Sequence, residues 1–156
     1  MLQERRQALP ETAKPYLLLI DFACRRTDFM PQLADVLTGY MTKVPADPAT
    51  DGSVAYAFLT RRPFDPSALE LAGRLIGRGM KTVTAEGREP RMEDADLFSA
   101  AALYASRTGA LSSALKMQQQ ATGRLAGASQ YRRAASLRLE EFYRKCLALG
   151  KPAATP

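Results

Sequence analysis

The sequence contains no histidine and no tryptophan among its 156 residues. Histidine is the side chain most often used as a general base near neutral pH, and it completes Ser-His-Asp and Cys-His catalytic groups. Its absence excludes those mechanisms and every metal site built on imidazole. Neither GxGxxG nor GxxxxGK[ST] occurs, so a glycine-rich phosphate cradle is not expected. The protein is therefore expected to be non-enzymatic and to need no cofactor.

Cysteine and long apolar runs are also scarce. The two cysteines, Cys24 and Cys146, are far apart and form no CxxC motif, which argues against a disulfide framework or a zinc site. No apolar stretch of about 18 residues is present, and the beginning MLQERRQALPE lacks the apolar region of a signal peptide. We expect a cytoplasmic protein without membrane contact.

The positive charge is concentrated in the C-terminal part of the chain. From Leu97 onward there are nine basic residues and two acids, a balance of +7, whereas residues 1–96 hold 13 bases and 14 acids. Such asymmetry predicts an anionic partner, either nucleic acid or an acidic protein surface. A solvated helix face is the simpler alternative, and Glu140 and Arg144 have the spacing to neutralise each other.

Short runs rich in apolar residues predict strands between residues 15 and 86. The clearest is VAYAFLT, where Tyr56 and Phe58 alternate with smaller residues in the period of a strand. The first run also fits a helix continuing through Arg26, because periodicity alone does not separate the two. The predicted strands are 15–22, 40–44, 54–60 and 80–84.

Two helices are predicted between these strands. Apolar residues from Leu33 to Tyr40 recur at helical spacing behind an N-cap at Thr27 or Asp28. Asp65 followed by proline begins the second helix, over 66–77, which glycines at 77 and 79 should end. The resulting order βαββαβ is the ferredoxin-like pattern, so an α+β fold is expected.

The segment after residue 92 changes character and predicts a helical hairpin. Residues 94–149 contain no proline and are rich in Ala, Leu, Gln and Arg, with a turn expected between Gly123 and Ser129. The acids Glu93, Asp94 and Asp96 open the first helix, where they complement its dipole rather than form a catalytic pair. The expected organisation is an arm over 1–14, a core over 15–86, a hairpin over 92–150 packed on the core, and a tail over 151–156.

The segment 15–86 resembles an RNA recognition motif (RRM). The family's octapeptide is similar to Val54–Arg61, with Tyr56 and Phe58 at two of its aromatic positions. The sequence departs from the family at Val54, Arg61 and Leu18. The resemblance implies that the two aromatic rings share an open sheet face on which RNA bases stack.

Five arginines complete the candidate nucleic-acid site. Arg61 and Arg62 precede the second helix and would contact phosphate, and Arg124, Arg132 and Arg133 surround the turn of the hairpin. The leading hypothesis is an RNA-binding protein, RNA being favoured over DNA. The alternative is an interaction subunit of a larger complex, without nucleic-acid contact, in which Tyr56 and Phe58 pack beneath the hairpin.

Overall fold

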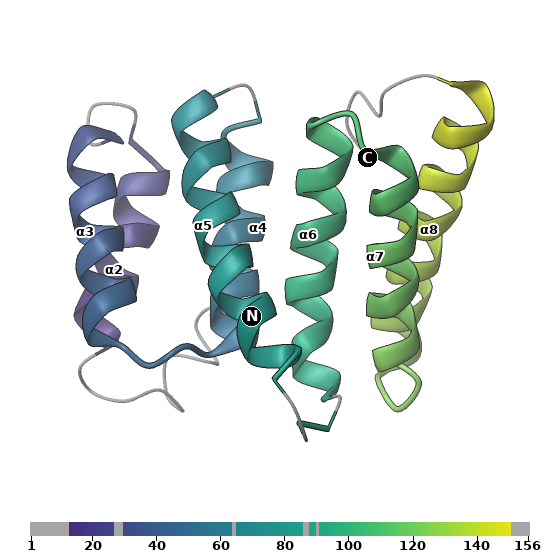
Figure 1. Cartoon of the computed structure of the whole chain (residues 1–156), viewed down its shortest axis with the longest axis horizontal. Helices are drawn as coiled ribbons and strands as arrows, with labels where there is room; N and C mark the ends of the chain where they lie inside the picture. The colour runs from purple at the N-terminus through teal and green to yellow at the C-terminus, as the bar shows by residue number, and fades with distance from the viewer. Residues whose placement is uncertain (1–12, 27–29, 64, 86–87, 90, 151–156) are drawn as a thin grey trace.

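The computed structural model describes residues 13–26, 30–63, 65–85, 88–89 and 91–150, and every regular element in those residues is helical (Figure 1). The predicted tail and all but the last two residues of the predicted arm lie outside them. No helix in the described residues is long and apolar enough to cross a bilayer. The helices are α2 (Lys14–Cys24), α3 (Met30–Lys43), α4 (Pro48–Arg61), α5 (Pro66–Val83), η2 (Met92–Asp94, a 3₁₀ turn), α6 (Ala95–Arg107), α7 (Leu111–Arg124) and α8 (Gln130–Leu149).

The α+β prediction is therefore wrong, and the likeness to an RRM ends with it. Residues 15–22 lie in α2 and 54–60 in α4, 40–43 form the last turn of α3, and 80–83 complete α5, with 44 and 84 just after these two helices. The octapeptide is helical because Asp47 caps α4, its side chain accepting the backbone N–H of Thr50 at 3.0 Å, with Pro48 in the first turn. Of the two possibilities for 15–22, the helix is correct.

Both predicted helices before residue 80 are confirmed. The Asp65 side chain accepts the N–H of Ser67 at 2.9 Å and begins α5 as expected. Leu33, Leu37 and Tyr40 form the buried stripe of α3. The predicted N-cap of α3 at Thr27 or Asp28 lies outside the described residues.

Neither Gly77 nor Gly79 ends α5, and Gly79 instead permits close packing on α6. The helix continues through Gly77 and Gly79 to Val83. A Cβ at position 79 would lie 2.8 Å from a methyl carbon of Leu97 on α6, and a Cβ on Gly52 of α4 would overlap the backbone of the same leucine. The two glycines let α4 and α5 approach α6 closely.

The C-terminal part is helical as predicted, but it contains three helices instead of two. Gly109 adopts a left-handed conformation, φ +82°, and separates α6 from α7. The second turn is where it was expected, and the Ser129 hydroxyl caps α8 by accepting the N–H of Arg132.

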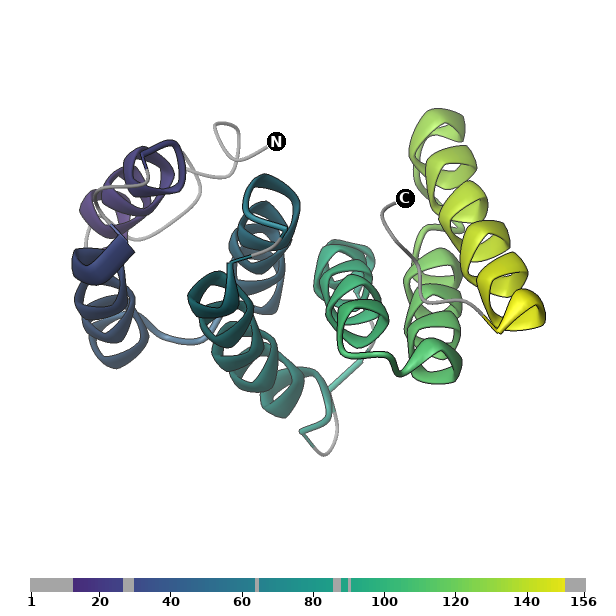
Figure 2. The ribbon, with the colours of Figure 1, turned by 90° about the horizontal axis from the view of Figure 1, so that it is seen from above.

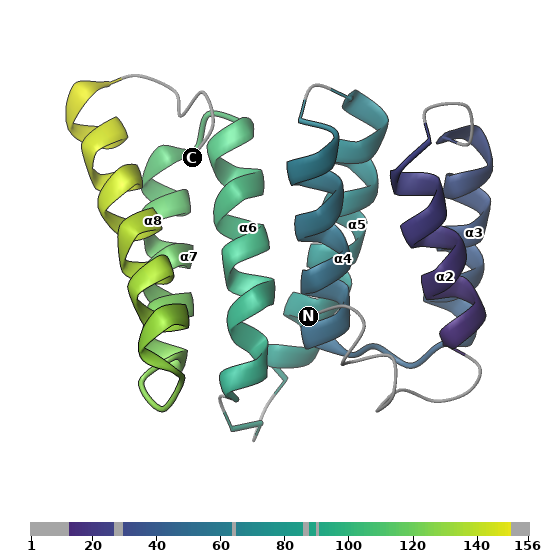
Figure 3. The same ribbon diagram turned by 180° about the vertical axis from the view of Figure 1, so that it is seen from behind.

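The helices form antiparallel hairpins arranged in one row. The pairs α2–α3, α4–α5 and α6–α7 stand side by side, and α8 packs on α7 at the end (Figures 1 and 2). Seen from behind, α2, α4 and α8 lie in front of α3, α5 and α7, so the row has two layers (Figure 3). This arrangement is typical of α-solenoids, in which each hairpin contacts its neighbours along the row.

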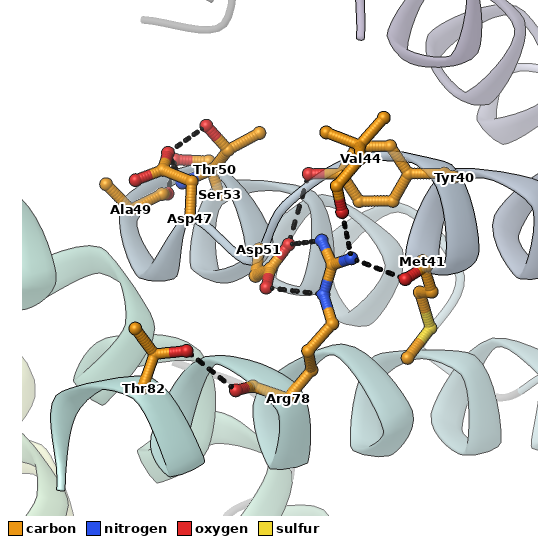
Figure 4. Close-up of polar contacts among 10 residues, drawn as sticks. All are labelled: Tyr40, Met41, Val44, Asp47, Ala49, Thr50, Asp51, Ser53, Arg78 and Thr82. Atoms are coloured by element: carbon orange, nitrogen blue, oxygen red, sulfur yellow. Dashed lines mark hydrogen bonds and ion pairs between the residues drawn. The ribbon is translucent and has the colours of Figure 1, made fainter. Parts of the chain in front are cut away.

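A buried polar network joins the first two hairpins (Figure 4). Arg78 of α5 donates from Nε to Asp51 Oδ2 at 2.9 Å and from Nη1 to the carbonyls of Met41 and Val44 at 3.1 and 3.0 Å. The Tyr40 hydroxyl donates to Asp51 Oδ1 at 3.1 Å, and the guanidinium lies 4.6 Å from its ring centre. The side chain of Arg78 thus satisfies the C-terminal carbonyls of α3 and fixes α3 against α4 and α5.

Candidate functional site

A groove of about 380 Å³ lies between α4, α6 and α8. In the view from above, α6 is set back between α4 and α8 (Figure 2). Helix α8 packs on α7, and α6 forms the floor of the hollow that remains beside it. From α4 the lining residues are Ser53, Tyr56, Ala57, Thr60 and Arg61; from α8 they are Tyr131, Arg132, Ala135, Ser136 and Leu139.

The hollow exists because small side chains face it. Ala57 on α4, Ala95 and Ser99 on α6 and Ala135 on α8 are lining residues, and none of them reaches far from its backbone. On α4 and α8 the lining positions recur every three or four residues over about two turns, which is roughly 12 Å of helix. The groove therefore follows the helix axes.

Two tyrosines stand at the groove. The side chain of Tyr131 is 83% exposed, an unusual state for a large ring. Tyr56 is half-buried, and burial together with the negative charge of Asp96 raises the pKa of its hydroxyl. At neutral pH it remains a neutral phenol that can donate a hydrogen bond.

One carboxylate ties together all three helices of the groove. Asp96, in the first turn of α6, accepts from the Ser53 hydroxyl of α4 at 3.2 Å and from Arg132 Nη2 of α8 at 3.0 Å. The Arg132 side chain is one-third exposed and that of Asp96 less so. This bridge sets the width of the groove at one end.

Arg61 lies at the other end of the α4 row. It pairs with Asp21 of α2 at 3.1 Å, and the same carboxylate also pairs with Arg25. Two guanidinium groups thus share the Asp21 carboxylate at this end of the groove.

The predicted pair of stacking aromatics is not formed. Phe58 is fully buried in the main core, whereas Tyr56 lines the groove. Residues two apart on a helix point about 200° away from each other, so a face shared in a strand is lost in α4. The alternative prediction placed both rings beneath the C-terminal hairpin; Phe58 is fully buried in the main core and Tyr56 is half-buried.

The arginines expected to surround the α7–α8 turn do not form one cluster. Arg132 lines the groove and Arg133 is exposed. Arg124 stacks on the Phe98 ring at 3.9 Å and donates to the Gln120 side chain at 2.9 Å. Burial lowers the pKa of Arg124, which lines a separate hollow beside Arg91.

The remaining predicted residues have local structural roles. The backbone N–H of Arg62 caps α4 by donating to the carbonyl of Phe58. The acids of the 93–96 cluster begin a helix as expected, and Asp94 makes two hydrogen bonds with Arg88, at 2.8 and 2.9 Å. These two bonds raise the pKa of the Arg88 guanidinium.

Sequence reasoning missed several groove residues. Tyr131 was not among the predicted site residues, and its exposure in the structure shows that this part of α8 is not covered. Small residues such as Ala57 and Ser99 carry no chemical signature that marks them in a sequence. The bridging role of Asp96 depends on Arg132, which is distant in the chain, so it required the fold.

No family model matches the chain, and neither curated proteins nor solved structures show a match. Among residues 13–26, 30–63, 65–85, 88–89 and 91–150 there is no group of three Cys, Asp or Glu side chains that could hold a metal ion.

Proposed function

We propose that this chain is a non-catalytic protein-interaction module that captures a segment of a partner protein in the groove between α4, α6 and α8. One observation carries the proposal. An apolar hollow of about 380 Å³, large enough for two bulky side chains, is open to solvent beside an 83% exposed tyrosine. Tyrosine is enriched at protein interfaces because it combines a large contact area with a polar tip.

The position of the groove supports this proposal. Stacked helical hairpins provide extended surfaces that bind other chains. The RNA-binding mechanism has no comparable support, since it required a sheet and two aromatic rings on one face. The described residues contain no sheet, and Tyr56 and Phe58 do not share a face.

The proposal is tested by selecting binders and then filling the groove. Random peptides of about 16 residues displayed on phage are selected against the full chain, and affinities are measured for the native protein and for Ala135→Trp. Ala135 is exposed and lines the groove, so an indole there occupies the hollow without disturbing the core. We expect the affinity of the selected peptides to fall about tenfold or more.

Ala148→Trp is the matched control. Ala148 is also exposed on α8 but does not line the groove, and this variant should bind the peptides as the native chain does. Circular dichroism checks that both variants keep their helices. If no selected peptide distinguishes Ala135→Trp from Ala148→Trp, the groove is not a protein-binding site.

A further inference from the structure

The polar groups of the groove are mostly engaged within the protein. The Ser53 hydroxyl donates to the carbonyl of Ala49 and to Asp96, and the Thr60 hydroxyl donates to the carbonyl of Tyr56 at 2.8 Å. The Ser136 hydroxyl accepts from the side chain of Gln118 at 2.8 Å. An extended peptide in this groove would leave many of its backbone N–H and C=O groups without partners. An α-helix brings its own hydrogen bonds and needs only an apolar surface.

The shape of the groove points to the same occupant. Its walls are rows of side chains spaced by three or four residues on α4 and α8, and such rows receive the ridges of another helix. The length of about two turns accommodates apolar side chains at positions i, i+3 or i+4, and i+7 of a bound helix. Ala57 and Ala135, one on each wall, leave room for them.

The charge around the groove selects the partner. On α8, Glu140 pairs with Arg144 and Glu141 with Lys145, both at 2.8 Å, which neutralises these four residues. The side chains of Arg133 and Arg138 pair with no carboxylate among the described residues. Arg138 lies seven residues after Tyr131 and thus on the same side of α8, next to the groove. At the end of the groove away from the Asp96 bridge, Arg61 pairs with Asp21, which also pairs with Arg25.

We propose that the groove binds an amphipathic α-helix of a partner protein, whose apolar stripe fills the hollow between α4 and α8 and whose flanks carry Asp or Glu. This inference rests on the proposed function and specifies its partner. The flanking acids meet Arg138 on one side and the guanidinium pair of Arg61 and Arg25 at the end.

The helical form of the ligand is tested on the peptides selected above. Binding of each synthetic peptide to the native chain is followed by circular dichroism and by fluorescence anisotropy. We expect helix content to rise on binding, and a proline at the centre of the peptide to weaken binding about tenfold or more, since proline breaks a helix interior. Proline at the first peptide position is the control and should be tolerated.

The acidic flanks are tested on the protein side. Arg138→Gln should weaken peptide binding about threefold or more at low salt, and the difference should shrink at high salt because exposed charges are screened. Lys145→Gln is the matched control, as Lys145 is exposed on the same helix and already paired with Glu141. The selected peptides should be enriched in Asp and Glu.

The outcomes separate this inference from the proposed function. Peptides that are sensitive to Ala135→Trp, gain helix on binding, carry acids and respond to Arg138→Gln support both. Groove-dependent peptides that bind as extended chains, or that are basic, overturn the helix or charge inference and leave the interaction module in place. Peptides insensitive to Ala135→Trp overturn both.

Discussion

At the residue scale, the Asp51 carboxylate shows how the first joint of the row is held. The residue is fully buried and accepts from both Arg78 and Tyr40. Burial raises the pKa of Asp51, while the bonds from Arg78 act in the opposite direction and favour the ionised form. Burial likewise raises the pKa of Tyr40 well above its usual range, so its hydroxyl stays protonated as the donor.

Arg78→Met should lower the free energy of unfolding by about 3–5 kcal/mol, because it leaves a buried carboxylate without its counter-charge. Urea denaturation followed by circular dichroism measures the change. Arg74→Met is the control: Arg74 lies one turn earlier on α5, is exposed and donates to the Thr38 hydroxyl. Its cost should stay near 0.5 kcal/mol. Equal effects of the two substitutions would mean that the Asp51 network stabilises the protein no more than the exposed Arg74 hydrogen bond does.

The destabilisation by Arg78→Met should also depend on pH. Removing the guanidinium takes away the interaction that lowers the pKa of Asp51, so its pKa in the folded variant rises further. A carboxyl with a raised pKa in the folded state favours folding at low pH and loses that contribution as the pH rises through this pKa. The difference in unfolding free energy between the native chain and Arg78→Met should therefore become smaller as the pH falls from 7 to about 5. A difference in unfolding free energy that does not change with pH would contradict burial of the Asp51 charge.

At the element scale, two glycines in neighbouring helices are expected to behave in opposite ways. Gly77→Ala should stabilise the protein by about 0.5–1 kcal/mol, because the position is exposed inside α5 and a Cβ would meet nothing within 4 Å. Gly52→Ala should destabilise it by about 1–3 kcal/mol or more, since its Cβ would overlap the Leu97 backbone. Thermal unfolding compares the two variants. If Gly52→Ala stabilised the protein, α4 and α6 would be able to move apart without a loss of stability.

The start of α4 and the role of its glycine could not be read from the sequence. Asp47-Pro48 begins a helix by the same chemistry as Asp65-Pro66, yet only the second pair was predicted to begin a helix, because Tyr56 and Phe58 after the first pair suggested a strand. Gly52 and Gly79 instead serve helix contact. Nothing local distinguishes a glycine that ends a helix from one that packs against a neighbour.

The octapeptide shows why periodicity was insufficient. Tyr56 and Phe58 alternate with alanine, which fits a strand, but Val54, Ala55, Phe58 and Leu59 also form one buried helix face. Alanine fits both patterns, so the choice depended on what the segment packs against. The apolar stripe from Leu33 to Tyr40, the Asp65-Pro66 start and the helix-forming composition of 94–149 made these segments predictable as helical, but not where each helix ends.

At the scale of the whole molecule, stability should decrease toward the α8 end of the row. Only Ser136 and Tyr143 are buried in the 20 residues of α8, whereas α6 buries 8 of its 13. Amide hydrogen exchange should therefore be faster in α8 than in α6, because local opening there exposes little apolar surface. Equal protection would show that the row unfolds as one unit. Binding of a groove-dependent peptide should slow exchange in α8.

The charge asymmetry is a property of the sequence, and what it means depends on where the fold places each charge. Arg124 and Arg132 face aromatic or acidic neighbours inside the molecule, and the pairs on α8 neutralise four more charges. Lys116 on α7 and Arg133 and Arg138 on α8 remain exposed and pair with no carboxylate among the described residues. A net charge counted along the chain does not reveal which guanidinium groups are already paired within the folded protein.

The three arginines that reach from the second hairpin back to the first have a mechanical consequence. Arg61, Arg74 and Arg78 all belong to α4 or α5, and each bonds to a group on or just after α2 or α3. Backbones at this joint approach each other less extensively than between α4 and α6. Under tension applied along the row, this joint would yield first, and its three guanidinium links would break at a short extension while the hairpins on either side stayed folded.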